Sequence, residues 1–160
     1  MILNAFGDIV KNQWLWLEQQ YWFVILDEFV VMPNHFHGIL IIDSDNNKSQ
    51  ELSLVAENSR DCSLPKIKPL PQLIGAFKTT SSKLIHNLES LSKTQYEQIQ
   101  FKWHKSFYDR IIRTEKELNN VRNYIKNNPL KWSLDIENSS ATIEDNKNND
   151  YYEKIIESKK

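Results

Sequence analysis

Cysteine is almost absent from this chain of 160 residues, which contains Cys62 alone. A single cysteine excludes a disulfide framework and a cysteine metal site, and it fits a reducing compartment. The chain also lacks an apolar run near the ~20 residues of a membrane span, and it lacks the charged and apolar regions of a signal peptide. We therefore expect a cytoplasmic protein without membrane contact, formed by one domain that is long enough for a proper core.

The overall charge of −1 conceals an uneven distribution along the chain. Residues 66–131 hold 13 Lys or Arg and 5 Asp or Glu, a net of +8, and the remainder carries −9. Concentrated positive charge is what binding to a phosphate backbone requires. Because lysine-rich helices are also common on solvated surfaces, charge alone leaves an ordinary surface as the alternative to nucleic-acid binding.

Hydrophobic periodicity indicates an α+β protein. It predicts helices at residues 6–20, 70–88 and 114–128 and strands at residues 22–32, 35–42 and 101–113. Pro33-Asn34 is the turn between the first two strands. Thr114 and Glu117 form a capping box for the last helix. We expect Pro129 to end this helix by excluding αR at the residue before it. Residues 43–68 are polar and aperiodic, so we expect a long mobile loop there.

Two histidines flank Phe36 in MPNHFHGILII, residues 32–42. Side chains at positions i and i+2 of a strand share a face, so His35 and His37 should lie side by side. Two imidazoles on a rigid strand can bind one divalent metal ion. A pair of half-buried structural histidines is the alternative explanation of this motif.

The last predicted helix carries Tyr124 and, one turn later, Asn128. If this helix lies across the histidine face, Asn128 can offer its amide oxygen as a third metal ligand. A phenol is a poor nucleophile at its ordinary pKa near ~10, so Tyr124 would need a metal-polarised phosphate and a fixed approach. From periodicity alone, a helix-edge aromatic with its hydroxyl in water is the simpler explanation of Tyr124.

Taken in order, these stretches resemble the REP-associated tyrosine transposases, which are single-tyrosine members of the HUH (His-hydrophobic-His) endonucleases. The similar residues are MPNHFHGILII, WHKSFYDRIIR at 103–113 and YIKNNPLKW at 124–132, and with weaker similarities they span roughly residues 5 to 133. The resemblance implies that Tyr124 is the catalytic nucleophile. It also implies that His35, His37 and Asn128 bind a metal ion, for which mixed nitrogen and oxygen ligands suit Mg²⁺ or Mn²⁺, while two imidazoles would also accept Zn²⁺.

The resemblance further implies cleavage and rejoining of single-stranded DNA, often folded into hairpin-forming repeats, through a covalent 5′-phosphotyrosine and a free 3′-OH. Six basic side chains are expected at the DNA: Lys78, Lys83, His104, Arg110, Arg113 and Arg122. The protein would act as a monomer or a homodimer.

The family fold is ferredoxin-like, βαββαβ, and its first strand is central in the sheet. Little sequence precedes the first helix here. We therefore expect an N-terminally truncated transposase domain at residues 1–133 without that strand, followed by a mobile acidic tail at residues 134–160. Unpaired backbone groups should make this chain marginally folded or prone to associate through its open edge.

Two other functions stay open. The first is a catalytically decayed or domesticated transposase that acts as a DNA-binding module, because the basic half remains useful for binding without cleavage. The second is a metallohydrolase for small molecules. The sequence disfavours it because no Glu or Asp is spaced to serve as a further ligand on the histidine strand.

Overall fold

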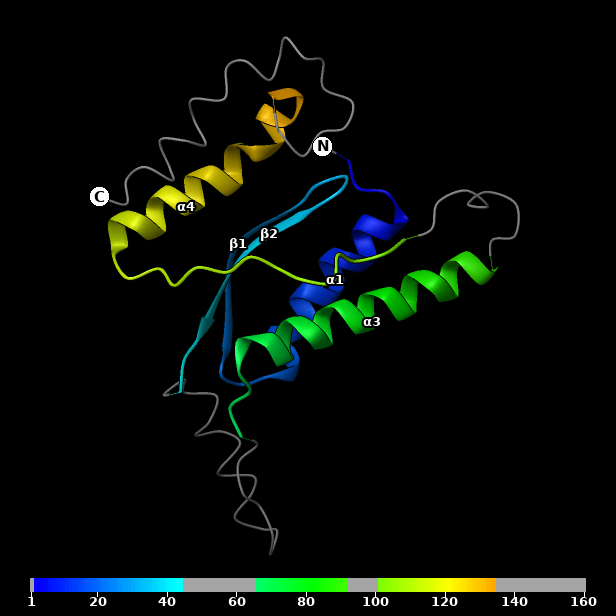
Figure 1. Ribbon diagram of the computed structural model, residues 1–160, viewed down its shortest axis with the longest axis horizontal. Helices are drawn as coiled ribbons and strands as arrows, with labels where there is room; N and C mark the ends of the chain where they lie inside the picture. The colour runs from blue at the N-terminus through cyan, green and yellow to red at the C-terminus, as the bar shows by residue number, and fades with distance from the viewer. Residues whose placement is uncertain (1, 45–65, 92–100, 135–160) are drawn as a thin grey trace, which may run out of the picture. The chain divides into compact units, whose positions relative to one another are not determined.

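A helix and a β-hairpin come first along the described chain, and α-helices of 22 and 13 residues follow (Figure 1). The computed structural model describes residues 2–44, 66–91 and 101–134. Its elements are α1 (Ala5–Gln20), β1 (Val24–Val31), β2 (Phe36–Ile42), α3 (Leu70–Leu91), α4 (Glu115–Asn127) and the 3₁₀ helix η1 (Asn128–Leu134). The α+β class is confirmed, and α1, β1, β2, α3 and α4 begin and end within three residues of the predicted positions, whereas η1 was not predicted. Most of the predicted loop and nearly all of the predicted tail lie outside the described residues.

The described residues form two compact units that alternate along the chain. One comprises residues 28–38 and 112–134 of the described chain, and we call it the tip unit because it contains the turn of the hairpin. The other comprises residues 2–27 and 39–111, and we call it the two-helix unit because it contains α1 and α3.

The hairpin is a two-stranded antiparallel sheet of β1 and β2. The Met32 N–H donates to the His35 carbonyl oxygen at 2.9 Å, which closes the turn at Pro33-Asn34. In the tip unit, the Phe29 and Phe36 rings stack with their centroids 6.2 Å apart. Cross-strand aromatic pairs of this kind help to fix the register of a hairpin, and this register determines where the histidines of β2 lie.

The core of the two-helix unit forms between α1 and α3, which run side by side (Figure 1). Trp14 packs edge-to-face against Phe77, with ring centroids 5.3 Å apart. The buried residues of α3 recur every four positions, as an amphipathic helix requires. They are Leu73, Phe77, Ser81 and Ile85. In the described ranges, no helix combines the length and the apolar character needed to cross a lipid bilayer.

The strand predicted at residues 101–113 is wrong, because this segment joins no sheet in the described part of the chain. A strand is stable only when a neighbour pairs with its N–H and C=O groups, and no described strand lies before α1 to supply that neighbour. Side chains of α3 hold the segment instead. The Trp103 indole N–H donates to Ser81 Oγ at 2.9 Å. The Lys78 ammonium donates to the carbonyl oxygens of His104 and Ser106 at 3.0 and 2.7 Å.

Helix α4 begins at the capping pair that the sequence predicts. Thr114 Oγ accepts the Glu117 N–H at 3.2 Å, and the Glu117 carboxylate accepts the N–H of Arg113 at 3.1 Å. The helix ends just before Asn128, as expected from Pro129. The backbone of Asn128 nevertheless lies in the αR region (φ −56°, ψ −46°), which we expected Pro129 to exclude. Proline is tolerated in the first turn of a new helix, where its missing N–H has no partner to lose, so η1 continues through it.

Candidate active site at the tip of the hairpin

The rings of His35 and His37 lie side by side at the start of β2. Their centroids are 4.7 Å apart and their planes meet at 69°. Both side chains are half-buried. Phe36, between them in sequence, pairs instead with Phe29, as the alternation of a strand requires. The hairpin therefore brings two imidazoles together on one face.

Asn34 fixes the orientation of the first imidazole. Nδ1 of His35 lies 2.8 Å from Oδ1 of Asn34. An amide oxygen only accepts hydrogen bonds, so Nδ1 of His35 carries the proton and donates. The lone pair of a neutral His35 is then on Nε2, which is buried. Histidines that bind metals typically have such a hydrogen-bonding partner on the ring nitrogen that does not bind the metal, and this partner orients the ring.

Helix α4 brings Tyr124 to the second imidazole. The Tyr124 hydroxyl oxygen and Nε2 of His37 are hydrogen-bonded at 3.2 Å, although the residues are 87 positions apart in sequence. The two rings meet edge-to-face, with centroids 5.2 Å apart. Tyr124 is half-buried, beside the buried Ile125 that anchors the apolar side of the helix. The predicted nucleophile and one predicted metal ligand are therefore in direct contact.

Asn128, the third predicted ligand, is buried with only 3% of its surface exposed. Its amide oxygen Oδ1 has no hydrogen-bond partner among the described residues. A buried polar atom that lacks a partner costs about 1–3 kcal/mol, so such atoms usually have a ligand or water to satisfy them. Asn128 caps the C-terminus of α4, one turn after Tyr124, and begins η1.

These residues fit a divalent cation in their donor chemistry. His35, His37 and Asn128 provide two imidazoles and one unsatisfied amide oxygen. No group of three or more His, Cys, Asp or Glu side chains that could hold a metal occurs within the described ranges. A cation held by this set would need water or phosphate oxygens to complete its coordination, as Mg²⁺ commonly does.

Two further contacts hold α4 and η1 against the hairpin within the tip unit. The Lys126 ammonium forms an ion pair with the Glu28 carboxylate of β1, at 2.7 Å. The Trp132 indole of η1 packs against the His35 ring, with centroids 5.8 Å apart. Sequence reasoning gave Asn34 only a part in the turn and Trp132 only a place at the end of a motif, and it assigned no role to Lys126 or Glu28. The signal for Asn34 at the site is its position directly before the His-Phe-His motif.

The expected DNA contacts of the two-helix unit differ in how accessible they are. Lys83, His104 and Arg110 are exposed. Lys78 is half-buried, and its ammonium is used by two carbonyl oxygens and lies 5.6 Å from the centroid of the Phe107 ring. This partial burial lowers the pKa of Lys78 through desolvation. Lys78 therefore has a structural role in anchoring the extended segment, which competes with a phosphate contact.

The expected DNA contacts of the tip unit are Arg113 and Arg122. Arg113 is exposed just before α4. Arg122 forms an ion pair with Glu115 at 3.3 Å and donates to the Asn119 amide oxygen at 3.1 Å, both on the same helix. Arg122 would have to leave these partners, or share them, to contact a phosphate.

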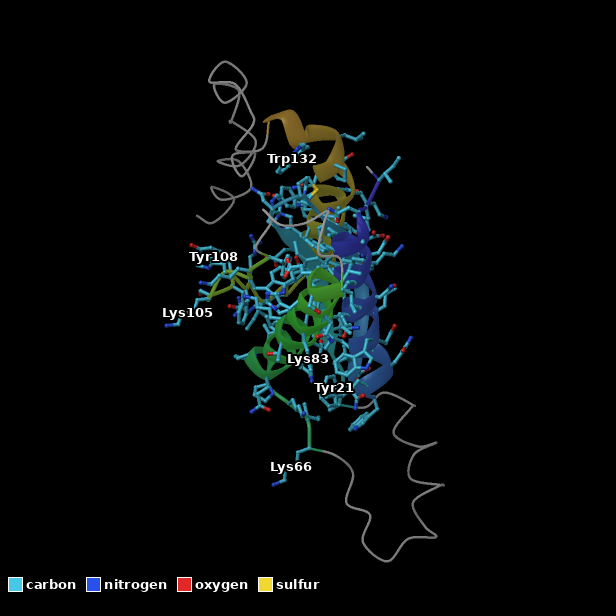
Figure 2. The ribbon with its side chains drawn as sticks, turned by 90° about the vertical axis from the view of Figure 1, so that its right-hand side faces the viewer. Tyr21, Lys66, Lys83, Lys105, Tyr108 and Trp132 are labelled. Atoms are coloured by element: carbon cyan, nitrogen blue, oxygen red, sulfur yellow. The ribbon has the colours of Figure 1, made fainter. Side chains whose placement is uncertain are left out.

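Tyr108 is the most exposed aromatic side chain of the two-helix unit. It is fully exposed, and Figure 2 shows it projecting from the extended segment, as does Lys105. Trp103 differs, because its ring packs against Phe77 with centroids 5.3 Å apart and its N–H is used by Ser81. Of Trp103 and Tyr108, it is Tyr108 that presents a face on which a base could stack.

Fold and site together define an α+β protein with a His-His-Tyr cluster at the tip of a hairpin. The chain is 31% identical over 141 residues to an uncharacterized protein of Haemophilus influenzae, in an alignment that covers 84% of this chain and 71% of that protein. The chain belongs to the same family as this Haemophilus protein. No family model and no solved structure matches the chain.

Proposed function

We propose that the protein is a metal-dependent endonuclease and strand transferase for single-stranded DNA, with Tyr124 as its nucleophile. The observation that carries this proposal is the hydrogen bond of 3.2 Å between the Tyr124 hydroxyl and Nε2 of His37. It supports the proposal because the two residues belong to separate motifs that resemble those of REP-associated tyrosine transposases. The resemblance implies that Tyr124 is the nucleophile and that His37 binds the metal ion. Because the nucleophile attacks the phosphate that the metal ion polarises, the two residues must lie at the same phosphate.

The proposed chemistry is a reversible transesterification. Bound Mg²⁺ or Mn²⁺ would act as a Lewis acid on the scissile phosphate. The Tyr124 oxygen forms a bond to phosphorus while the bond from phosphorus to the 3′ oxygen breaks. The phenol loses one proton and the departing 3′ oxygen gains one, so the products are a 5′-phosphotyrosine and a 3′-OH. Rejoining reverses these steps when a 3′-OH attacks the phosphotyrosine.

The proposed substrate is single-stranded DNA that folds into hairpins. Exposed basic side chains of both units would contact its phosphates, with Lys83, Arg110 and Arg113 as the most accessible of those expected. Tyr108 would stack on an unpaired base. We propose that the protein acts in the cytoplasm, as a monomer or a homodimer.

The test is a covalent trapping experiment. A pool of single-stranded oligonucleotides with palindromic hairpins and randomised flanks, labelled at the 3′ end, is incubated with the protein and Mg²⁺ or Mn²⁺. The wild type should give a labelled protein band that survives denaturation, since the 5′-phosphotyrosine retains the labelled fragment. Tyr124→Phe should give none, and Tyr108→Phe should still give it. A band of undiminished strength from Tyr124→Phe would refute the assignment of the nucleophile.

The metal ligands require a separate arm of this experiment. His35→Ala and His37→Ala should each abolish cleavage and its dependence on divalent cations. His86→Ala is the matched control, because this imidazole is on α3 in the two-helix unit with 54% of its side chain exposed. Cleavage at the wild-type rate by either of the first two variants, with the same cation, would show that His35 and His37 are structural.

The second candidate function is DNA binding without cleavage, as expected of a decayed or domesticated transposase. The observation in its favour is the two-stranded sheet of the described residues, where residues 101–113 do not form the predicted strand. Steeply salt-dependent binding of the same oligonucleotides, with no covalent band in Mg²⁺ or Mn²⁺, would select this function.

A further inference from the structure

Nε2 of His37 is a hydrogen-bonding partner of Tyr124 and, in the proposed function, also a ligand of the metal ion. Nε2 of His37 is hydrogen-bonded to the Tyr124 hydroxyl at 3.2 Å. Tyr124 belongs to α4, and Asn128, whose amide oxygen has no partner among the described residues, caps the C-terminus of that helix. Because Nε2 is the nitrogen of His37 that contacts Tyr124, it is the one that a cation bound next to the nucleophile would use.

An imidazole nitrogen cannot serve both partners at once. If Nε2 accepts the phenolic proton, its lone pair is occupied, and if Nε2 carries the proton, it has no lone pair to offer. Either tautomer of His37 must break the contact with Tyr124 before Nε2 can bind a metal ion. His35 is under no such constraint from Tyr124, because its Nδ1 already donates to Asn34 and its Nε2 carries the lone pair.

We propose that Tyr124 and a divalent cation compete for Nε2 of His37, so that arrival of the cation releases the nucleophile. Without a cation, the phenol is held against the imidazole and is kept from attack. With a cation on Nε2, the hydroxyl must turn away from the ring and becomes available to a phosphate. This inference rests on the proposed function, because it describes the regulation of the same site.

The surroundings of Tyr124 allow this release without movement of the helix. Ile125, its neighbour, is buried with 3% exposure, and Lys126 is tied to Glu28 of β1. These contacts hold the backbone of α4 in place. Tyr124 itself is only half-buried, so rotation about its own side-chain bonds is enough to move the hydroxyl.

The competition is tested by titrating Mn²⁺ into the metal-free protein by calorimetry, in the absence of DNA. Tyr124→Phe keeps the ring that packs against His37 and removes only the competing hydroxyl. It should bind Mn²⁺ about 2-fold to 10-fold more tightly than the wild type, the range that corresponds to one net hydrogen bond. Tyr108→Phe, which removes a fully exposed hydroxyl, should bind like the wild type.

Each other result of this titration contradicts the proposal. Weaker binding by Tyr124→Phe would make the phenol a metal ligand. Equal binding would mean that the cation does not use Nε2 of His37. Thermal unfolding of both variants without metal establishes that they are folded. His37→Ala should lose the tight Mn²⁺ site, and retention of that site would place the cation elsewhere.

A second experiment measures the ¹⁵N chemical shift of Nε2 of His37. In the protein labelled with ¹⁵N-histidine, Nε2 of His37 should have different chemical shifts in the wild type and in Tyr124→Phe, because only the wild type makes the hydrogen bond. Saturation with diamagnetic Zn²⁺ should bring both proteins to the same shift. Persistence of the difference in Zn²⁺ would overturn the competition. A protein that passes both tests but forms no covalent band would refute the nuclease function and leave the competition intact.

Discussion

The Tyr124 hydroxyl and Nε2 of His37 form a hydrogen bond of 3.2 Å between α4 and β2. The same unit contains a second imidazole on the same face of the hairpin and a buried amide oxygen with no partner among the described residues. These groups and the residues that support them should contribute separately to stability and to metal binding.

We predict that the Asn128 side chain lowers the free energy of unfolding of the metal-free protein and contributes to metal binding. Asn128→Leu has nearly the same shape and removes the unsatisfied buried oxygen. The free energy of unfolding without metal should therefore rise by roughly 1–3 kcal/mol, and the affinity for Mn²⁺ should fall. Urea unfolding and calorimetry measure the two effects. Asn127→Leu, at the exposed neighbouring position, should change stability by no more than ~0.5 kcal/mol. A loss of stability in Asn128→Leu would mean that its amide oxygen is already satisfied.

Asn34 is predicted to be a positioning residue for His35. Asn34→Ala removes the acceptor that keeps the proton on Nδ1 of His35, so both tautomers become populated and the ring turns more freely. Affinity for Mn²⁺ should fall by about 10-fold, the lower end of the effect of such partners on metal sites. Asn34→Asp keeps an acceptor at this position and should recover most of the affinity. Equal losses in both variants would indicate that the turn, and not the hydrogen bond, is what matters.

The ion pair between Lys126 and Glu28 is predicted to couple α4 to β1. Both side chains are partly exposed, so their coupling energy should be only ~0.2–1 kcal/mol. Lys126→Glu and Glu28→Lys should each destabilise the protein, and the double variant should recover stability. A double-mutant cycle at low and high salt measures this coupling, which salt should weaken. Lys116→Glu, in the first turn of the same helix, is the control and should not destabilise. No recovery in the double variant would show that the pair makes no net contribution.

Lys78 and Lys83 are predicted to have different roles although both lie on α3. Lys83→Ala should reduce the slope of DNA binding against salt by ~1, as expected for one lost phosphate contact. Lys78→Ala should mainly loosen residues 101–107, because it removes both hydrogen bonds to the carbonyl oxygens of this segment. Faster amide hydrogen exchange in that segment is the measurement. If Lys78→Ala instead reduced the slope of DNA binding against salt by ~1 and left amide hydrogen exchange in residues 101–107 unchanged, Lys78 would be a phosphate contact and not a structural residue.

The helices and the hairpin could be predicted from the sequence because each depends on local patterns. The four-residue spacing of buried positions in α3, the Thr114 cap and the Pro33-Asn34 turn are all contained within short stretches. The failed strand at residues 101–113 has a suitable alternation, but pairing is a long-range property that a single segment does not encode. The segment is held by Lys78 and Ser81 of a helix instead.

The candidate site was predictable only in part. Alternation along a strand places His35 and His37 together, and helical spacing places Asn128 one turn after Tyr124. The contact between Tyr124 and His37 could be expected only from the resemblance to the transposase family. The spacing of residues along the chain does not indicate it. The contacts of Asn34 and Trp132 with His35 depend on side-chain directions at a turn and in a 3₁₀ helix, for which the sequence has no periodic signal.

The position of Trp132 gives the tip unit a natural optical probe. Four of the five tryptophans, Trp14, Trp16, Trp22 and Trp103, belong to the two-helix unit. Trp132 belongs to the tip unit, where its ring centroid is 5.8 Å from that of His35 (Trp132 is labelled in Figure 2). An excited indole is sensitive to the charge of a nearby imidazole. Fluorescence from a protein that retains only this tryptophan would therefore report events at His35 without any attached label.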